Sequence, residues 1–150
     1  MNEEFQLFTA QELRVFGNKY VKILVDEIKS AGKGGGKLER SVDYRLVPTV
    51  RGLTIELESE EYLKYVDQGR KPGTYPNITA ISNWATLKGI SQDAVFPIAR
   101  KIFKFGIKPT NVISKTIRRL EMDPSITDKM EAALVRRIEY KLVQQIEKIN

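Results

Sequence analysis

The sequence predicts an α+β fold, in which a small antiparallel β-sheet is flanked by amphipathic helices from the two ends of the chain. Three observations predict it. Apolar residues follow a helical spacing over about 10–30, two short segments at 41–47 and 53–58 alternate apolar and polar residues, and apolar residues recur in steps of four over 126–146. Because two strands alone are only marginally stable, we expect helices or neighbouring subunits to cover the sheet.

The first helix begins with a capping box, in which Thr9 is the N-cap residue and Glu12 follows three residues later. One face of this helix is apolar and consists of Leu13, Phe16, Tyr20, Leu24 and Ile28. The helix is expected to end at Ser30, where a glycine-rich stretch over 31–37 has the composition of a flexible loop.

The centre of the chain reads as short elements separated by glycine and proline. A segment over 62–68 stops at Gly69, and a turn-rich loop over 70–76 follows. A helix from Ile78 is ended by Gly89, and the next helix starts near 94 because Pro97 fits only in a first turn. A shorter helix or extended piece continues to 120, and the last helix restarts at 123–125.

Composition restricts the chemistry. The 150 residues fit one domain, 1–150, with 41% hydrophobic and 29% charged residues, as in globular proteins. The absence of Cys excludes disulfides and thiolate metal sites, and the absence of His removes the usual general base and the commonest metal ligand. We therefore expect no enzyme activity, no cofactor and no metal.

The net charge of +6 is concentrated in one stretch. Residues 1–93 carry no net charge, whereas 94–120 contain no acidic residue and a set of basic ones, which we call the basic strip: Arg100, Lys101, Lys104, Lys108, Lys115, Arg118 and Arg119. Such a strip indicates either an anionic partner, such as nucleic acid or an acidic protein surface, or simply a solvated helical face.

Two other patterns are weaker. The glycine-rich stretch fails the P-loop pattern, because Leu38 follows Gly36-Lys37 and a helix precedes the loop. Glu56 and Glu58 share a strand face, which favours a solvent-exposed face over a metal site. No apolar run is long enough to span a bilayer, and the acidic start Met1-Asn2-Glu3-Glu4 is unlike a signal peptide, so we expect synthesis and retention in a cytoplasm unless the protein leaves within a larger particle.

The segment Tyr62-Leu63-Lys64-Tyr65-Val66-Asp67-Gln68-Gly69-Arg70-Lys71-Pro72-Gly73 resembles a signature of the tail-completion and neck (head–tail connector) proteins of tailed bacteriophages. Its continuation over 76–90, together with 99–102 and 106–110, is similar to the version in phages of Bacteroidetes hosts, including crAss-like phages. The stretch 38–42 resembles the entry of that family into its first strand. Thr110-Asn111-Val112-Ile113 departs from the widespread siphovirus pattern, which leaves open which ring of the neck the subunit would form.

The resemblance implies a structural protein of the virion, made in the host cytoplasm. It would form a ring of six or twelve copies that joins the portal or adaptor ring to tail proteins around the DNA channel. The residues expected at subunit contacts are Tyr62, Tyr65, Asp67, Arg70, Lys71 and Tyr75. The basic strip would face genomic DNA in the lumen, without sequence specificity, or an acidic neighbouring ring.

Two further hypotheses stay open. The chain could be a sequence-independent nucleic-acid-binding protein that neutralises phosphates with the basic strip. A metal-dependent carboxylate enzyme using Glu56, Glu58 or Asp67 is the third, although no second acidic cluster completes a site.

Overall fold

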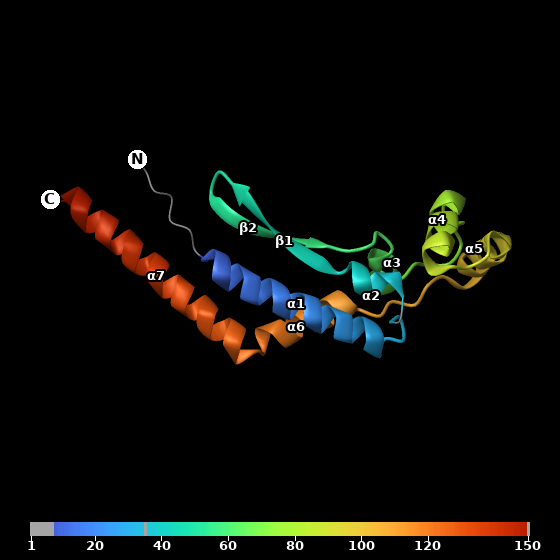
Figure 1. Cartoon of the computed structure of the whole chain (residues 1–150), viewed down its shortest axis with the longest axis horizontal. Coiled ribbons are helices and arrows are strands. Elements are labelled where there is room, and N and C mark those ends of the chain that lie inside the picture. Colours follow the sequence, from blue (N-terminus) through green and yellow to red (C-terminus); the bar gives the residue numbers. More distant parts are fainter. Residues whose placement is uncertain (1–7, 35, 150) are drawn as a thin grey trace. The chain divides into compact units, whose positions relative to one another are not determined.

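A computed structural model describes residues 8–34 and 36–149 (Figure 1). Within these residues there are seven α-helices, one 3-10 helix and one two-stranded antiparallel sheet, so the expected α+β class is confirmed. The chain divides into two compact units, each built from separate segments. Unit 1 comprises Met1–Ile23, Asp43–Glu58 and Thr116–Asn150, and unit 2 comprises Leu24–Val42 and Ser59–Lys115. The expectation of a single domain stays a prediction.

Helix α1 (Ala10–Ser30) begins and ends at the predicted residues. The Thr9 backbone N–H donates to Glu12 Oε2 at 2.9 Å, and the Glu12 N–H donates to Thr9 Oγ1 at 3.1 Å, so the capping box is formed. The bond from the Thr9 N–H is also the main cause that lowers the pKa of Glu12. Beyond Ser30, Gly32 adopts a φ of +73°, and the Lys33 N–H bonds back to the Ile28 carbonyl, which closes the helix end.

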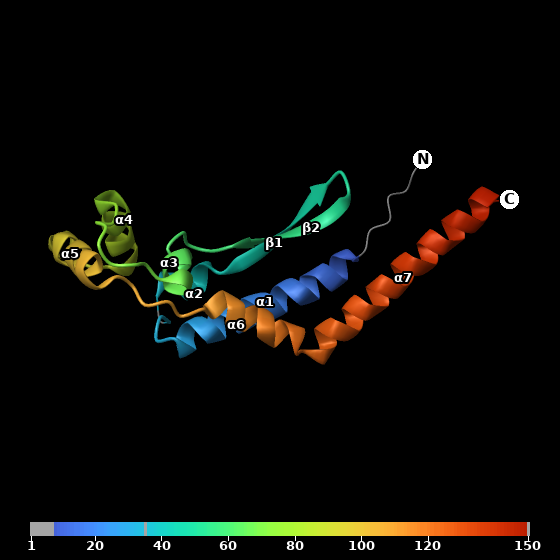
Figure 2. The ribbon, with the colours of Figure 1, turned by 180° about the vertical axis from the view of Figure 1, so that it is seen from behind.

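Strands β1 (Asp43–Thr49) and β2 (Gly52–Glu58) form a hairpin that lies along the first part of α1 in both views (Figures 1 and 2). Tyr44 pairs with Leu57 in the register, and its ring covers Gly17 of α1. The Tyr44 hydroxyl donates to Asn18 Oδ1 at 3.1 Å. The opposite face of the hairpin is polar, as the alternation predicts.

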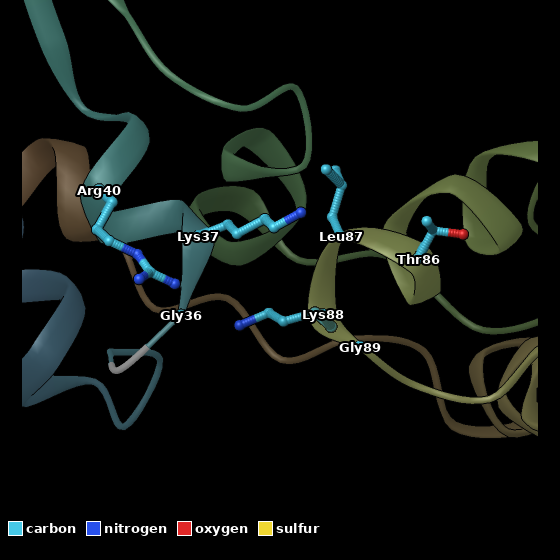
Figure 3. A pocket seen from close by; sticks show the side chains of 7 residues that line it. All are labelled: Gly36, Lys37, Arg40, Thr86, Leu87, Lys88 and Gly89. Atoms are coloured by element: carbon cyan, nitrogen blue, oxygen red, sulfur yellow. The ribbon is translucent and has the colours of Figure 1, made fainter.

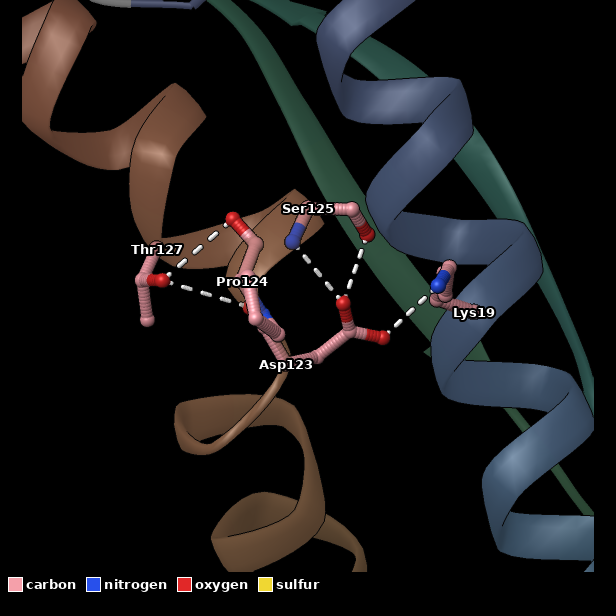
Figure 4. Close-up of polar contacts among 5 residues, drawn as sticks. All are labelled: Lys19, Asp123, Pro124, Ser125 and Thr127. Carbon is pink, nitrogen blue, oxygen red and sulfur yellow. Dashed lines mark hydrogen bonds and ion pairs between the residues drawn. The ribbon is translucent and has the colours of Figure 1, made fainter.

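The start of helix α7 (Pro124–Ile149) is fixed by Asp123 (Figure 4). One carboxylate oxygen accepts from Lys19 Nζ at 2.7 Å, and the other accepts from the Ser125 N–H at 2.9 Å. The hydrogen bond from Lys19 is the largest cause that lowers the pKa of Asp123 to about 2. One helical turn past the buried Ala133, Arg136 donates to both carboxylate oxygens of Glu12 at 3.0 Å. The first half of α7 is thereby joined to α1.

Unit 2 contains most of the short helices. Their bounds are α2 (Lys37–Ser41), α3 (Leu63–Gln68), α4 (Ile78–Lys88), the 3-10 helix η1 (Gln92–Ala94), α5 (Val95–Phe105) and the first residues of α6 (Val112–Glu121). Asn77 caps α4 by accepting from the Ala80 N–H at 3.1 Å, and Gly89 ends it in the left-handed conformation. The core of this unit consists of Leu24, Ile28, Leu38, Val42, Leu63, Ala85, Val95, Ala99 and Val112.

The sequence did not predict helix α2. The glycine-rich loop was expected to continue through Lys37, and the strand was expected from Ser41; the residues 37–41 are instead helical, and the strand starts at Asp43. The reason is tertiary: Leu38 is fully buried, and Ser41 Oγ accepts from the Glu60 N–H at 3.0 Å, so five residues form a helix that no periodicity could reveal. Gly35 lies outside the described residues.

Candidate functional site

The centre of the resembling segment is organised by a backbone bridge between two helix ends. Helix α3 ends at Gly69 and helix α5 ends at Gly106. The next residues pair: the Arg70 N–H donates to the Ile107 carbonyl, and the Ile107 N–H donates to the Arg70 carbonyl, both at 2.8 Å. Both glycines have a φ near +70°, and a Cβ on either would run into the opposite backbone. The pairs Gly69-Arg70 and Gly106-Ile107, which are distant in sequence, therefore hold the ends of α3 and α5 together.

The loop after the bridge is held against α5. The Arg70 guanidinium donates to the Tyr75 carbonyl at 3.0 Å, and the Gly73 N–H donates to the Phe103 carbonyl at 2.8 Å. The Tyr75 ring stacks on the Phe103 ring with 4.4 Å between centroids. Tyr75 nevertheless remains 54% exposed, and Lys71 is exposed. These contacts hold the loop in place, and its exposed side chains are the aromatic Tyr75 and the cationic Lys71.

The buried side chain of Asp67 accepts a hydrogen bond from the backbone of its own chain. It is 8% exposed, and its Oδ1 accepts from the Ile113 N–H at 2.9 Å, near the start of α6. Its carbonyl accepts from the Asn111 N–H at 3.0 Å. These bonds join α3 to the start of α6, so the place of Asp67 in the resembling segment has an internal, structural reason.

Tyr62 and Tyr65 are half-buried. The Tyr62 ring meets the edge of Trp84 at 6.5 Å, and its hydroxyl is buried. Burial raises the pKa of Tyr62, the Glu60 carboxylate adds to the rise, and the Leu38 backbone N–H acts in the opposite sense. Tyr65 lies under Lys64, with the Nζ atom 5.0 Å from the ring centroid. Of the six expected contact residues, Lys71 and Tyr75 are thus the exposed ones.

All seven residues of the basic strip are exposed. Arg100, Lys101 and Lys104 lie on α5, Lys108 lies in the following loop, and Lys115, Arg118 and Arg119 lie on α6. On α6 the opposite side of the helix is buried through Val112, Thr116 and Leu120. The strip is divided between the two units after Lys115, so it consists of two basic groups.

Two apolar surface features stand out, of which only the second follows a pattern that the sequence predicts. Phe96 and Phe105 of α5 are each 66% exposed, next to the cations of the same helix. The second half of α7 exposes an apolar set of Leu134, Val135, Ile138, Leu142 and Ile146. The steps of four predicted an apolar stripe there but not that it would be left uncovered within the described residues.

The acidic residues of the enzyme hypothesis are engaged elsewhere. Arg45 contacts Glu56 Oε2 at 2.7 Å and Glu58 Oε1 at 3.0 Å, so the hairpin carboxylates form a cross-strand ion-pair cluster. In the part of the chain that the structure describes, no three acidic, His or Cys side chains gather as a metal site would require. Among the described helices, none combines the length and apolarity needed to cross a membrane.

Comparisons with known proteins give no relative: no family model, curated protein or solved structure matches the chain. What the site can do must therefore be inferred from its own surfaces.

Proposed function

We propose that the chain is a structural ring subunit of the neck or tail of a tailed bacteriophage, a head–tail connector or tail-completion protein. It would be made in the host cytoplasm, assemble in six or twelve copies, and join a portal or adaptor ring to the tail around the DNA channel. The resembling segment 62–73 supports this proposal. In it, Gly69 permits the close approach of the Ile107 backbone, and Asp67 accepts a hydrogen bond from the Ile113 N–H. The proposed role needs no catalytic residue and no cofactor.

The observation that carries the proposal is the apolar face of α7, defined as Leu134, Val135, Ile138, Leu142 and Ile146. These residues are 51–59% exposed. At 100° per residue they lie within an arc of about 120°. The buried residues Ile126 and Ala133 lie on a different side of the helix, toward the rest of unit 1. An exposed, mostly apolar face of this kind, interrupted at Gln145, is typical of a protein–protein interface.

The braced loop supports the same proposal. A subunit contact needs side chains presented by a rigid backbone, because ordering a loose loop on binding weakens association. The Arg70–Ile107 bridge and the Tyr75–Phe103 stack supply that rigidity, and Tyr75 and Lys71 are the exposed groups. Tyrosine is enriched in interface cores, whereas lysine is depleted there and belongs to the polar rim, so Tyr75 is the expected anchor.

The alternative is a sequence-independent nucleic-acid-binding protein. The observation that favours it is the surface of α5, where Phe96 and Phe105 are exposed beside Arg100, Lys101 and Lys104. Aromatic rings that can stack on bases, next to cations that can neutralise phosphates, are the groups that such proteins use. This alternative predicts a monomer whose DNA affinity falls steeply with salt.

The experiment compares sedimentation of the wild-type chain with that of two double variants. Ile138→Glu with Leu142→Glu places two negative charges on the apolar face of α7, and we expect it to abolish oligomers at concentrations where the wild-type chain forms them. The matched control, Lys141→Gln with Lys148→Gln, changes the net charge by the same amount at exposed cations of this helix and should assemble normally. Equal assembly of all three proteins would remove the α7 face from the proposal.

A further inference from the structure

A hollow of about 360 Å³ lies in unit 2 between α2 and the end of α4 (Figure 3). Gly36, Lys37 and Arg40 line it on one side, and 86–89 line it on the other. The Lys37 and Lys88 side chains extend into the space between the two helices, and the Arg40 side chain runs along α2 toward Gly36 at its edge. None of these residues belongs to the basic strip.

The hollow carries charge of one sign. It is lined by three cations and no carboxylate. Among the described residues, none of the ion pairs involves Lys37, Arg40 or Lys88. The nearby Glu39 does not line the hollow, and its Oε2 atom lies 2.8 Å from the position of a Cβ on Gly34. A concave surface lined by one sign of charge focuses its field and attracts the opposite charge.

Gly36 leaves space that the end of the Lys88 side chain occupies. Its φ of −123° and ψ of −167° are extended values that any residue adopts, so its backbone does not require glycine. A Cβ at this position would instead lie 2.7 Å from Lys88 Nζ. The same Nζ is 5.9 Å from the centroid of the Tyr62 ring, which steadies it by a cation–π contact. The ammonium of Lys88 thus lies next to the Gly36 backbone and the Tyr62 ring at the edge of the hollow.

The chemistry of these groups selects an oxyanion. A guanidinium can donate two parallel hydrogen bonds to a tetrahedral oxyanion, and two ammonium groups add point charges. The Thr86 hydroxyl does not contribute, because it already donates to the Ser82 carbonyl at 3.1 Å. A multiply charged anion is attracted to a hollow that is lined by three cations and no carboxylate.

We propose that this hollow is a phosphate-binding site, in which Lys37, Arg40 and Lys88 contact the phosphoryl oxygens. The site does not follow the P-loop pattern rejected from the sequence, since side chains and not loop amides hold the anion. The phosphate can belong to a nucleic-acid backbone or to a free phosphorylated molecule. The inference does not rest on the proposed ring function, since it concerns a hollow contained in unit 2.

The test is a titration of the full chain by heteronuclear NMR with inorganic pyrophosphate and, in a second arm, with a short DNA duplex. We expect saturable shifts centred on the amides of Gly36, Lys37 and Gly89. Shifts with pyrophosphate alone would assign a small phosphorylated ligand, and shifts with both ligands or with DNA alone would assign a nucleic-acid phosphate.

The variant Lys37→Gln, Arg40→Gln, Lys88→Met removes the three charges and keeps the stem of Lys88. We expect it to weaken binding at least about tenfold, because several charge-assisted hydrogen bonds are lost. It should melt close to the wild-type chain in ligand-free buffer, since none of the three side chains is buried. The control Lys22→Gln, Arg51→Gln, Lys148→Gln removes the same charges from exposed positions of unit 1 and should bind as the wild type does.

Two results would overturn the site. Shifts spread over lysines and arginines throughout the chain, weakened equally by both triple variants, would show only general attraction between opposite charges. An absence of shifts at the three amides with both ligands would show that the hollow binds no phosphate. The single variant Lys37→Gln repeats the measurement if the triple variant unfolds.

Discussion

At the scale of single residues, glycine has different uses at positions with the same φ. Gly69 and Gly89 have φ values of +68° and +69°, but Gly69 has a ψ of −166° and faces the opposing backbone of Ile107, whereas Gly89 has a ψ of 26° and open space. The first combination is accessible essentially to glycine alone, and the second is the ordinary left-handed region. Two glycines that look alike in the sequence therefore differ in how strictly their backbone conformation requires glycine.

We expect Gly69→Ala to destabilise the fold by about 3 kcal/mol or more, since backbone strain and a steric clash add together. Gly89→Ala is the matched control and should cost only about 1 kcal/mol for left-handed backbone. Urea unfolding of the two variants measures the difference. Equal losses would mean that the Arg70–Ile107 bridge does not depend on its glycines.

The ion pair at the start of α7 predicts a pH dependence. The pKa of Asp123 is about 2 in the folded chain against an ordinary 3.8, so the folded state favours the ionised form. A lowered carboxyl pKa contributes stability that is fully present above the ordinary value and is lost as the pH falls from about 4 toward 2. Melting temperatures of the wild-type chain should fall across this window, and Asp123→Asn should flatten part of that fall. An unchanged slope would contradict the role of the pair.

At the scale of elements, the packing of the β1–β2 hairpin on α1 depends on the absence of a side chain at Gly17. Gly17 lies within α1, where helix propensity alone favours Ala by about 1 kcal/mol. A Cβ on Gly17 would lie 2.6 Å from the Tyr44 ring, so the glycine permits the hairpin to pack on the helix. The need to pack the Tyr44 ring against α1 outweighs the preference of a helix for Ala over Gly.

Gly17→Ala is therefore expected to destabilise the wild-type chain by about 1–3 kcal/mol through overpacking. In a Tyr44→Val background, where the ring is gone, the same change should stabilise by about 0.5–1 kcal/mol. The change of sign, measured by chemical denaturation of the four proteins, identifies the contact. A stabilising effect in both backgrounds would rule the contact out.

The elements also show where sequence patterns succeed and fail. The boundaries of α1, of α4 and of α5 follow from caps, from Gly89 and Gly106, and from the single place where Pro97 fits, all of which are local signals. Helix α2 has no local signal, because the burial of Leu38 decides it. The Arg70–Ile107 bridge joins residues distant in sequence, and its two glycines were read only as helix stops. The phosphate-binding hollow was missed for the same reason, since Lys88 is far from Lys37 and Arg40 along the chain.

At the scale of the whole molecule, the proposed assembly rests on surfaces that are uncovered within the described residues. Its sheet has only two strands among the described residues, and the apolar face of α7 has no cover there. A chain of 150 residues can bury a sizeable core of its own, so the proposal explains the uncovered helix face by assembly and not by instability. Head-to-tail contacts between identical subunits close into a ring when the rotation between neighbours allows it.

Native mass spectrometry over a range of protein concentrations tests the ring proposal most directly. The account predicts one dominant species of six or twelve copies, with few intermediate masses, because a closed ring satisfies every contact at once. Disruption of that species by Ile138→Glu with Leu142→Glu, but not by Lys141→Gln with Lys148→Gln, would assign the contact to α7. A ladder of masses without a preferred number would contradict closure, and a strict monomer whose DNA binding disappears with added salt would favour the nucleic-acid-binding alternative instead.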